Sequence, residues 1–225
     1  MNAATRRLWL TAGCLLLGFV VLTLAGAAFG PNATIGDTRS HVTKALVTSS
    51  MTKVFASGYV EFIAGLVFLV ATLLIARLLR GNGDLDGWLS SAISATAIVY
   101  TAVGVAAGSA AGAAAVYNGH HGAPLAVITT VDDIRNVAFS LSGGVAGLLT
   151  LATAAAGQST RLLPRWLSYT GYVVGVVMIA AVPAAKAGAP QVLLWFAWLV
   201  ALGIAALRVP RRSRAPVSAA FAASA

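Results

Sequence analysis

The chain has 225 residues, of which 59% are apolar and 9% are charged, and its formal net charge is +9. Ordinary soluble domains contain roughly 45–50% apolar and about 25% charged residues. The composition therefore excludes a water-soluble fold, which could not cover its surface with so few charges. The lysines and arginines lie in short segments between apolar runs rather than on one soluble face, so we expect the lipid bilayer, and no nucleic acid, as the partner.

Six segments are long and apolar enough to cross a bilayer as helices, since a hydrocarbon core about 30 Å thick needs roughly 20 apolar residues. The sequence therefore predicts an all-α fold, a polytopic transmembrane helical bundle with six spans that form a single domain over residues 1–209. A basic, disordered cytoplasmic tail is expected over residues 210–225. The six segments are Leu8–Phe29, Val54–Leu79, Trp88–Tyr117, Val131–Ala156, Trp166–Ala185 and Gln191–Val209.

The first segment has an alternative interpretation. The letters "RR" precede an apolar run that ends in "AGAA", a pattern that also occurs in cleaved secretory signals. The apolar stretch is longer than a typical signal core, and five further spans follow it. We therefore expect the segment to remain as the first span.

The cations predict the orientation, because cytoplasmic segments of membrane proteins carry an excess of lysine and arginine. With the N-terminus inside, ten cations fall in cytoplasmic segments and five in outer segments. We therefore expect a multi-pass protein of the cytoplasmic membrane, with both termini in the cytoplasm. Arginine outnumbers lysine, and alanine, glycine and valine dominate, a composition that fits a bacterium with GC-rich coding.

The connections between the segments differ in length. The stretches "RGNGDLDG" and "GQSTRLLP" predict tight cytoplasmic turns, because Gly, Asn, Asp and Pro favour turns. Longer outer loops are expected over residues 30–53 and in "NGHHGAPLAVITT". Asp132 and Asp133 are expected to cap the start of the fourth span, where carboxylates stabilise exposed backbone N–H groups.

Glycines recur at four-residue spacing in the third span, at Gly104, Gly108 and Gly112, and in the fourth span, at Gly143 and Gly147. Small residues at this spacing let helix backbones approach closely in lipid. We therefore expect these glycines to pack helices together. Whether they face a neighbour in the same chain, another protomer of a homo-oligomer or a membrane-protein partner stays open.

Glu61 is the only glutamate of the chain and lies within the second span. Helical spacing places it on one face with Ser57, Gly58, Gly65 and Phe68, followed by Thr72. A lipid-facing stripe would carry large apolar residues instead. Glu61 is therefore expected to point into the bundle.

Arg135, near the outer end of the fourth span, is the candidate partner of Glu61 in an intramembrane polar pair. A charge near the bilayer centre costs at least about 2.5–3.5 kcal/mol unless it is paired, neutralised or able to reach the interface. Two alternatives compete with the pair. Asp132 could hold Arg135 locally, three residues away on the same helix, and Glu61 could stay protonated and donate a hydrogen bond to a hydroxyl such as Ser57.

No motif for catalysis or for a cofactor is present. The chain lacks a G-x-S-x-G elbow, an H-E-x-x-H motif, a Walker loop and a dinucleotide fingerprint. His41, His120 and His121 could supply metal ligands, but their spacing is not diagnostic of a metal site. We therefore expect no catalytic residue, no metal and no cofactor, and we do not expect an enzyme.

Three stretches resemble a broad group of uncharacterised bacterial six-helix integral membrane proteins that carry a domain of unknown function. They are "RRLWLTAG" opening the first span, "RLLR" closing the second and "LLPRWLSYTGYVVG" opening the fifth. The likeness extends from Arg6 to about Arg208. The resemblance implies a six-helix fold and no particular activity.

Two functional classes remain. The first is a non-catalytic helical bundle that acts as a partner or stabilising component of the membrane, which the glycine spacing favours. The second is a small transporter or channel that uses Glu61 and Arg135 in a polar site of the outer leaflet. A cavity that reaches Glu61 from the outer side would favour the second class.

Overall fold

The structure, a computed structural model, describes residues 3–29, 39–80, 87–183 and 188–208. Within these ranges the chain is helical and has no strand, which confirms the prediction of an all-α bundle. The expected tail over residues 210–225 lies outside the described residues. The elements are α1 (Ala3–Phe29), α2 (Arg39–Thr48), α3 (Met51–Leu79), α4 (Trp88–Tyr100), a π-helical segment (Thr101–Ala107), α5 (Gly108–His120), α6 (Leu125–Thr160), α7 (Arg165–Ala180) and α8 (Gly188–Leu207).

Five helical stretches of the described chain are long and apolar enough to cross a membrane, as expected of a membrane protein. The predicted fifth span, Trp166–Ala185, differs from them. It contains α7, which has 16 residues and is about 24 Å long at 1.5 Å per residue. The six-span interpretation therefore depends on α7. The five stretches are Ala3–Ala28, Met51–Leu79, Trp88–His120, Leu125–Thr160 and Pro190–Leu207.

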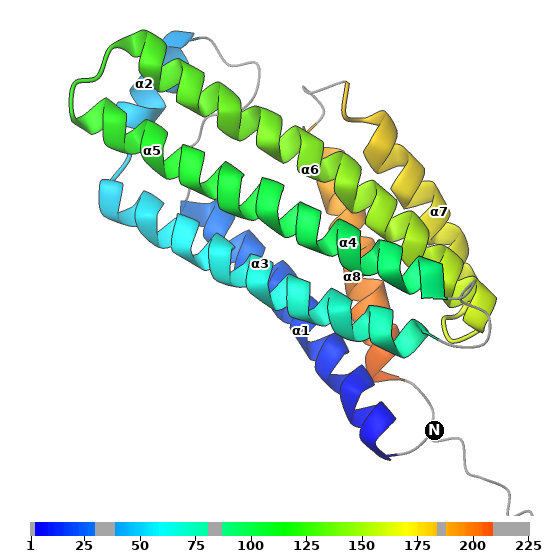
Figure 1. The fold of residues 1–225 in the computed structure, drawn as a ribbon. Helices are drawn as coiled ribbons and strands as arrows, with labels where there is room; N and C mark the ends of the chain where they lie inside the picture. The colour runs from blue at the N-terminus through cyan, green and yellow to red at the C-terminus, as the bar shows by residue number, and fades with distance from the viewer. Residues whose placement is uncertain (1–2, 30–38, 81–86, 184–187, 209–225) are drawn as a thin grey trace, which may run out of the picture.

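The long helices close into a ring in chain order (Figure 1). Helix α1 packs against α3, α3 against α4 and α5, both of these against α6, α6 against α7, α7 against α8, and α8 back against α1. Short connections make successive helices antiparallel neighbours. The turn from α6 to α7 shows how: Arg161 adopts a left-handed conformation with φ 55° and ends α6, and Pro164 immediately precedes α7.

Five aromatic side chains from α1, α3, α4 and α8 meet inside the ring. Phe68 lies with its ring centroid 4.5 Å from that of Phe19, 5.0 Å from Tyr100 and 5.7 Å from Trp195, and Phe196 packs beside Trp195 at 5.6 Å. Tilted and edge-on pairs of this kind stabilise a core beyond the area that they bury. These residues are called the aromatic cluster below. The indole of Trp195 also donates a hydrogen bond of 3.0 Å to the Thr150 hydroxyl, which links the cluster to α6.

The outer connections are more helical than the sequence indicates. Part of the first expected loop forms α2, whose Leu46 is fully buried in a small core beside α5 and α6. Helix α6 begins at Leu125, six residues before the predicted Val131, and has no acidic residue in its first turn. The prediction that Asp132 and Asp133 cap this helix is therefore wrong, because both lie beyond its first turn.

Candidate functional site

Glu61 lies on the face of α3 that the spacing indicates. Four residues of this face are buried, and Gly58 is half-buried; the buried ones are Ser57, Gly65, Phe68 and Thr72. Glu61 itself is partly exposed, and its Oε2 accepts a hydrogen bond of 2.9 Å from the Ser109 hydroxyl of α5. The carboxylate is therefore held between helices and is in contact with a neutral donor.

Helix α1 passes very close to this part of α3. The Ser57 hydroxyl donates a hydrogen bond of 2.8 Å to the carbonyl of Gly26. A Cβ atom added at Gly26 would lie 3.0 Å from Cγ of Glu61. The absence of a side chain at Gly26 thus leaves room for Glu61.

Arg135 of α6 has partners on its own helix. Its guanidinium forms an ion pair of 3.4 Å with Asp132, whose side chain is 6% exposed, and lies 5.6 Å from the centre of the Phe139 ring. Asn136 donates a second hydrogen bond to Asp132, at 3.2 Å. Arg135 is therefore held by Asp132 on its own helix, which is one of the two alternatives to a Glu61–Arg135 pair that the sequence left open.

Glu61 and Arg135 nevertheless line one cavity of about 250 Å³, together with Ser109, Tyr100 and other residues of α1, α6 and the π-helical segment. In the described part of the chain, the ion pair of Arg135 is with Asp132, and none joins Arg135 to Glu61. The structure therefore brings the two predicted residues to the same cavity, with a separate partner for each. This space is called the Glu61 cavity below.

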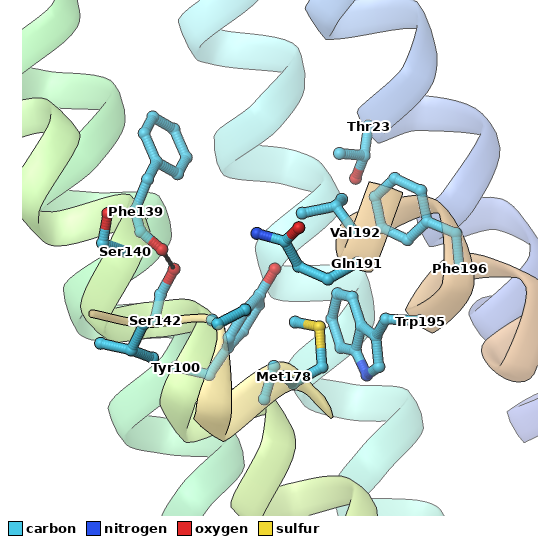
Figure 2. Close-up of a pocket in the computed structure, with 14 residues that line it drawn as sticks. Thr23, Tyr100, Phe139, Ser140, Ser142, Met178, Gln191, Val192, Trp195 and Phe196 are labelled. Atoms are coloured by element: carbon cyan, nitrogen blue, oxygen red, sulfur yellow. Dashed lines mark hydrogen bonds between the residues drawn. The ribbon is translucent and has the colours of Figure 1, made fainter. Parts of the chain in front are cut away.

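A second cavity of about 300 Å³ adjoins the first and shares Thr23, Tyr100 and Phe139 with it. Its walls are mainly apolar and include Met178 and Trp195 (Figure 2). The volume lies at the lower end of the range of roughly 300–1,000 Å³ that ligand pockets have. This space is called the Trp195 cavity below.

Three polar groups face the Trp195 cavity without a partner. The Thr23 hydroxyl oxygen is buried and has no hydrogen-bond partner. Figure 2 shows the Tyr100 hydroxyl and the Gln191 amide directed towards the same space. Among the described residues, no hydrogen bond joins either group to another side chain or to the backbone. A mainly apolar cavity with a few convergent polar groups is typical of a ligand site.

The π-helical segment accounts for part of this arrangement. Tyr100 and Ser109 are nine residues apart, which is about two and a half turns of a regular α-helix and would place them on opposite faces. Residues Thr101–Ala107 between them form a π-helix, which turns less per residue because its hydrogen bonds run from i to i+5. Both side chains consequently reach the Glu61 cavity.

The predicted packing glycines face other helices of the same chain. A Cβ atom at Gly104 would lie 2.7 Å from Cβ of Ser142, one at Gly108 would lie 3.4 Å from the Phe139 ring, and one at Gly112 would lie 3.0 Å from Cδ of Arg135. The three glycines thus follow one face of α6. On α6 itself, Gly147 lies against the backbone of Gly175 on α7, with 2.7 Å from an added Cβ to the carbonyl oxygen, whereas Gly143 has ordinary space, with Met178 at 3.9 Å.

The outer histidines have local contacts. His120 lies with Nε2 2.7 Å from the carbonyl oxygen of Ser49, which ties the end of α5 to the segment between α2 and α3. His121 stacks on Tyr117 with ring centroids 4.0 Å apart. Across the described residues, no group of three or more His, Cys, Asp or Glu side chains is placed to hold a metal ion.

No family model, curated protein or solved structure matches this chain. The function of the site is therefore inferred from its own residues. Five residues of the site were not predicted from the sequence, namely Thr23, Tyr100, Ser109, Gln191 and Trp195. Each of these residues has a polar or amphipathic side chain inside or at the end of an apolar span. Such residues occur in every span, so this feature does not distinguish the site.

Proposed function

We propose that this protein is a multi-pass protein of the bacterial cytoplasmic membrane, with both termini in the cytoplasm, and that it carries protons through an outward-facing site at Glu61. The observation that supports this proposal is the cavity that Glu61 and Arg135 line from α3 and α6. We also propose that the chain belongs to the group of bacterial six-helix membrane proteins that its sequence resembles.

The depth of the two charges supports an outer site. Counted along the helices from the arginine-rich end of the bundle, Glu61 lies about 27 Å from Leu79, and Arg135 lies about 38 Å from Thr160, at 1.5 Å per residue. A hydrocarbon core is about 30 Å thick. With Leu79 and Thr160 at or beyond the inner boundary of this core, Glu61 and Arg135 both lie in its outer part, where a charge costs less than at the bilayer centre.

The aromatic cluster favours a carrier over a channel. Phe19 and Phe68 are almost completely buried, and their rings are in contact at the centre of the ring of helices. Phe19 also lines the Glu61 cavity, so the cluster closes the inner side of this cavity. A carrier must close one side of its site while the other side is open, whereas an open channel needs a continuous path.

The alternative remains a non-catalytic bundle that stabilises or assists another membrane component. Its support in the sequence was the glycine spacing and the scarcity of buried polar groups. Gly104, Gly108, Gly112 and Gly147 lie against helices of the same chain, so they no longer indicate a surface for a second protein.

Proton movement into liposomes tests the proposed function. The purified protein is reconstituted, a potassium diffusion potential with valinomycin drives protons inward, and an enclosed pH-sensitive dye reports them. We expect faster acidification than in protein-free liposomes, and we expect Glu61→Gln to abolish the difference. Asp133→Asn removes an exposed carboxylate of α6 outside both cavities and should leave the rate unchanged. A wild-type rate equal to that of empty liposomes would contradict the carrier.

A further inference from the structure

We infer that the Glu61 and Trp195 cavities together bind an amphipathic organic cation, with an ammonium head beside Glu61 and an apolar body against Trp195. The inference deepens the proposed function, since it names the class of molecule that the site takes. It concerns binding alone and does not require transport.

The charges around the Glu61 cavity favour a cation. Arg135 is neutralised by Asp132 at 3.4 Å, and Asp132 is further held by Asn136. The partner of Glu61 is the neutral Ser109 hydroxyl. Among the described residues that line the cavity or touch these groups, Glu61 is therefore the one carboxyl group without a cationic partner.

Such a carboxylate is costly in apolar surroundings unless a cation neutralises it. A bound ammonium group would supply the missing positive charge. An anion would be repelled by Glu61 and would find Arg135 already paired. A neutral molecule would leave the carboxylate without a counterion.

The walls of the Glu61 cavity suit an ammonium head. Phe19, Tyr100 and Phe139 all contribute to its lining. The face of an aromatic ring attracts a cation within about 6 Å of its centre, and this attraction is the usual basis for recognising quaternary ammonium groups. The guanidinium of Arg135 already lies 5.6 Å from the centre of Phe139, which leaves Tyr100 for a ligand.

The Trp195 cavity suits the apolar body. It adjoins the Glu61 cavity, since Thr23, Tyr100 and Phe139 line both. Met178, Trp195 and Phe196 form apolar walls (Figure 2), and the polarizable sulfur of methionine adapts to different shapes. The Gln191 amide, which is directed towards this space, could bind a polar substituent on this body.

Titration calorimetry on the purified full chain in detergent tests the inference. The probes are benzyltrimethylammonium chloride and its neutral isostere neopentylbenzene, which has the same shape without the charge. We expect the wild type to bind the cation and to bind the isostere about tenfold or more weakly. Equal binding of the two probes, or no binding of the cation, would overturn the inference.

Two variants locate the bound cation. Glu61→Gln keeps the size of the side chain and should weaken binding of the cation by about tenfold or more. Asp133→Asn should leave the affinity unchanged. Ser109→Ala removes the helix contact of Glu61 but retains the carboxylate, so it should weaken binding less than Glu61→Gln does, and equal losses in the two variants would overturn the role of the charge. If Glu61→Gln binds as tightly as the wild type, the site of the cation is not at Glu61 and the inference falls.

The outcomes separate binding from transport. Binding of the cation without proton movement in liposomes would retain the inference and reject the carrier. Proton movement that depends on Glu61, without binding of the cation, would retain the carrier and reject the inference.

Discussion

At the scale of single residues, the charged side chains near the outer end of the bundle have different environments. Asp132 accepts from both Arg135 and Asn136 and is almost completely buried. Glu61 accepts from a hydroxyl and faces a cavity. The arginine therefore belongs to a structural group on α6, while the glutamate is available for a ligand or a proton.

A double-mutant cycle should distinguish the two possible partners of Arg135. We expect Arg135→Gln and Asp132→Asn each to lower the free energy of unfolding, and the double variant to cost less than the sum, with a coupling of about 0.5–3 kcal/mol as for residues in contact. The reason is that removing one partner leaves the other charge poorly compensated. Unfolding of the detergent-solubilised protein by a denaturant provides the measurement.

The matching cycle of Arg135→Gln with Glu61→Gln provides the control. Because Arg135 and Glu61 each have another partner, the coupling energy between these two residues should be clearly smaller than that between Arg135 and Asp132. A larger coupling with Glu61 would show that the direct pair predicted from the sequence dominates in the membrane.

At the scale of elements, the helices approach one another most closely where glycines meet. Gly147 of α6 and Gly175 of α7 lie backbone to backbone: a Cβ at either one would lie less than 3.0 Å from the carbonyl oxygen of the other. Backbone atoms cannot move aside as the end of a flexible side chain can. The contact between α6 and α7 is therefore rigid at this point.

The glycines of α6 offer a matched comparison four residues apart. We expect Gly147→Ala to destabilise the bundle by about 1–3 kcal/mol, because the new methyl group would overpack the contact with α7. Gly143→Ala meets only Met178 at an ordinary distance of 3.9 Å and should be neutral or stabilising, since alanine favours a helix over glycine by up to about 1 kcal/mol. Thermal unfolding in detergent measures the stability of both variants, and equal effects of the two substitutions would contradict the close contact.

At the scale of the whole molecule, α6 relates the bundle to the membrane. Its 36 residues extend about 54 Å, well beyond a hydrocarbon core of about 30 Å. Its two ends should therefore lie in water on opposite sides. The arginine-rich end is the cytoplasmic one in the proposed orientation.

Cysteine labelling at the two ends of α6 tests this orientation. Cys14 is exposed and is first replaced by serine. In intact cells, a membrane-impermeant maleimide should label Thr130→Cys and should label Ser159→Cys only after the membrane is opened, since both positions are exposed on the helix surface. The reverse pattern would invert the proposed topology, and labelling of both in intact cells would exclude a spanning α6.

The sequence alone determined that the chain is helical, because uninterrupted apolar runs in lipid must satisfy their backbone hydrogen bonds within each segment. It also determined which face of α3 is buried, because small and polar residues recur there at helical spacing. Both properties depend on residues close together in the chain.

The tertiary structure decided which residues meet at the site. Tyr100 and Ser109 line one cavity because a π-helical segment separates them, and Gln191 reaches the adjoining cavity because α8 closes the ring beside α1. The tertiary structure also decided between the two partners that the sequence offered for Arg135: its ion pair is with Asp132 on α6 and not with Glu61 on α3. These outcomes depend on how helices pack over long distances in the chain, and the periodicity of a single span carries no information about that packing.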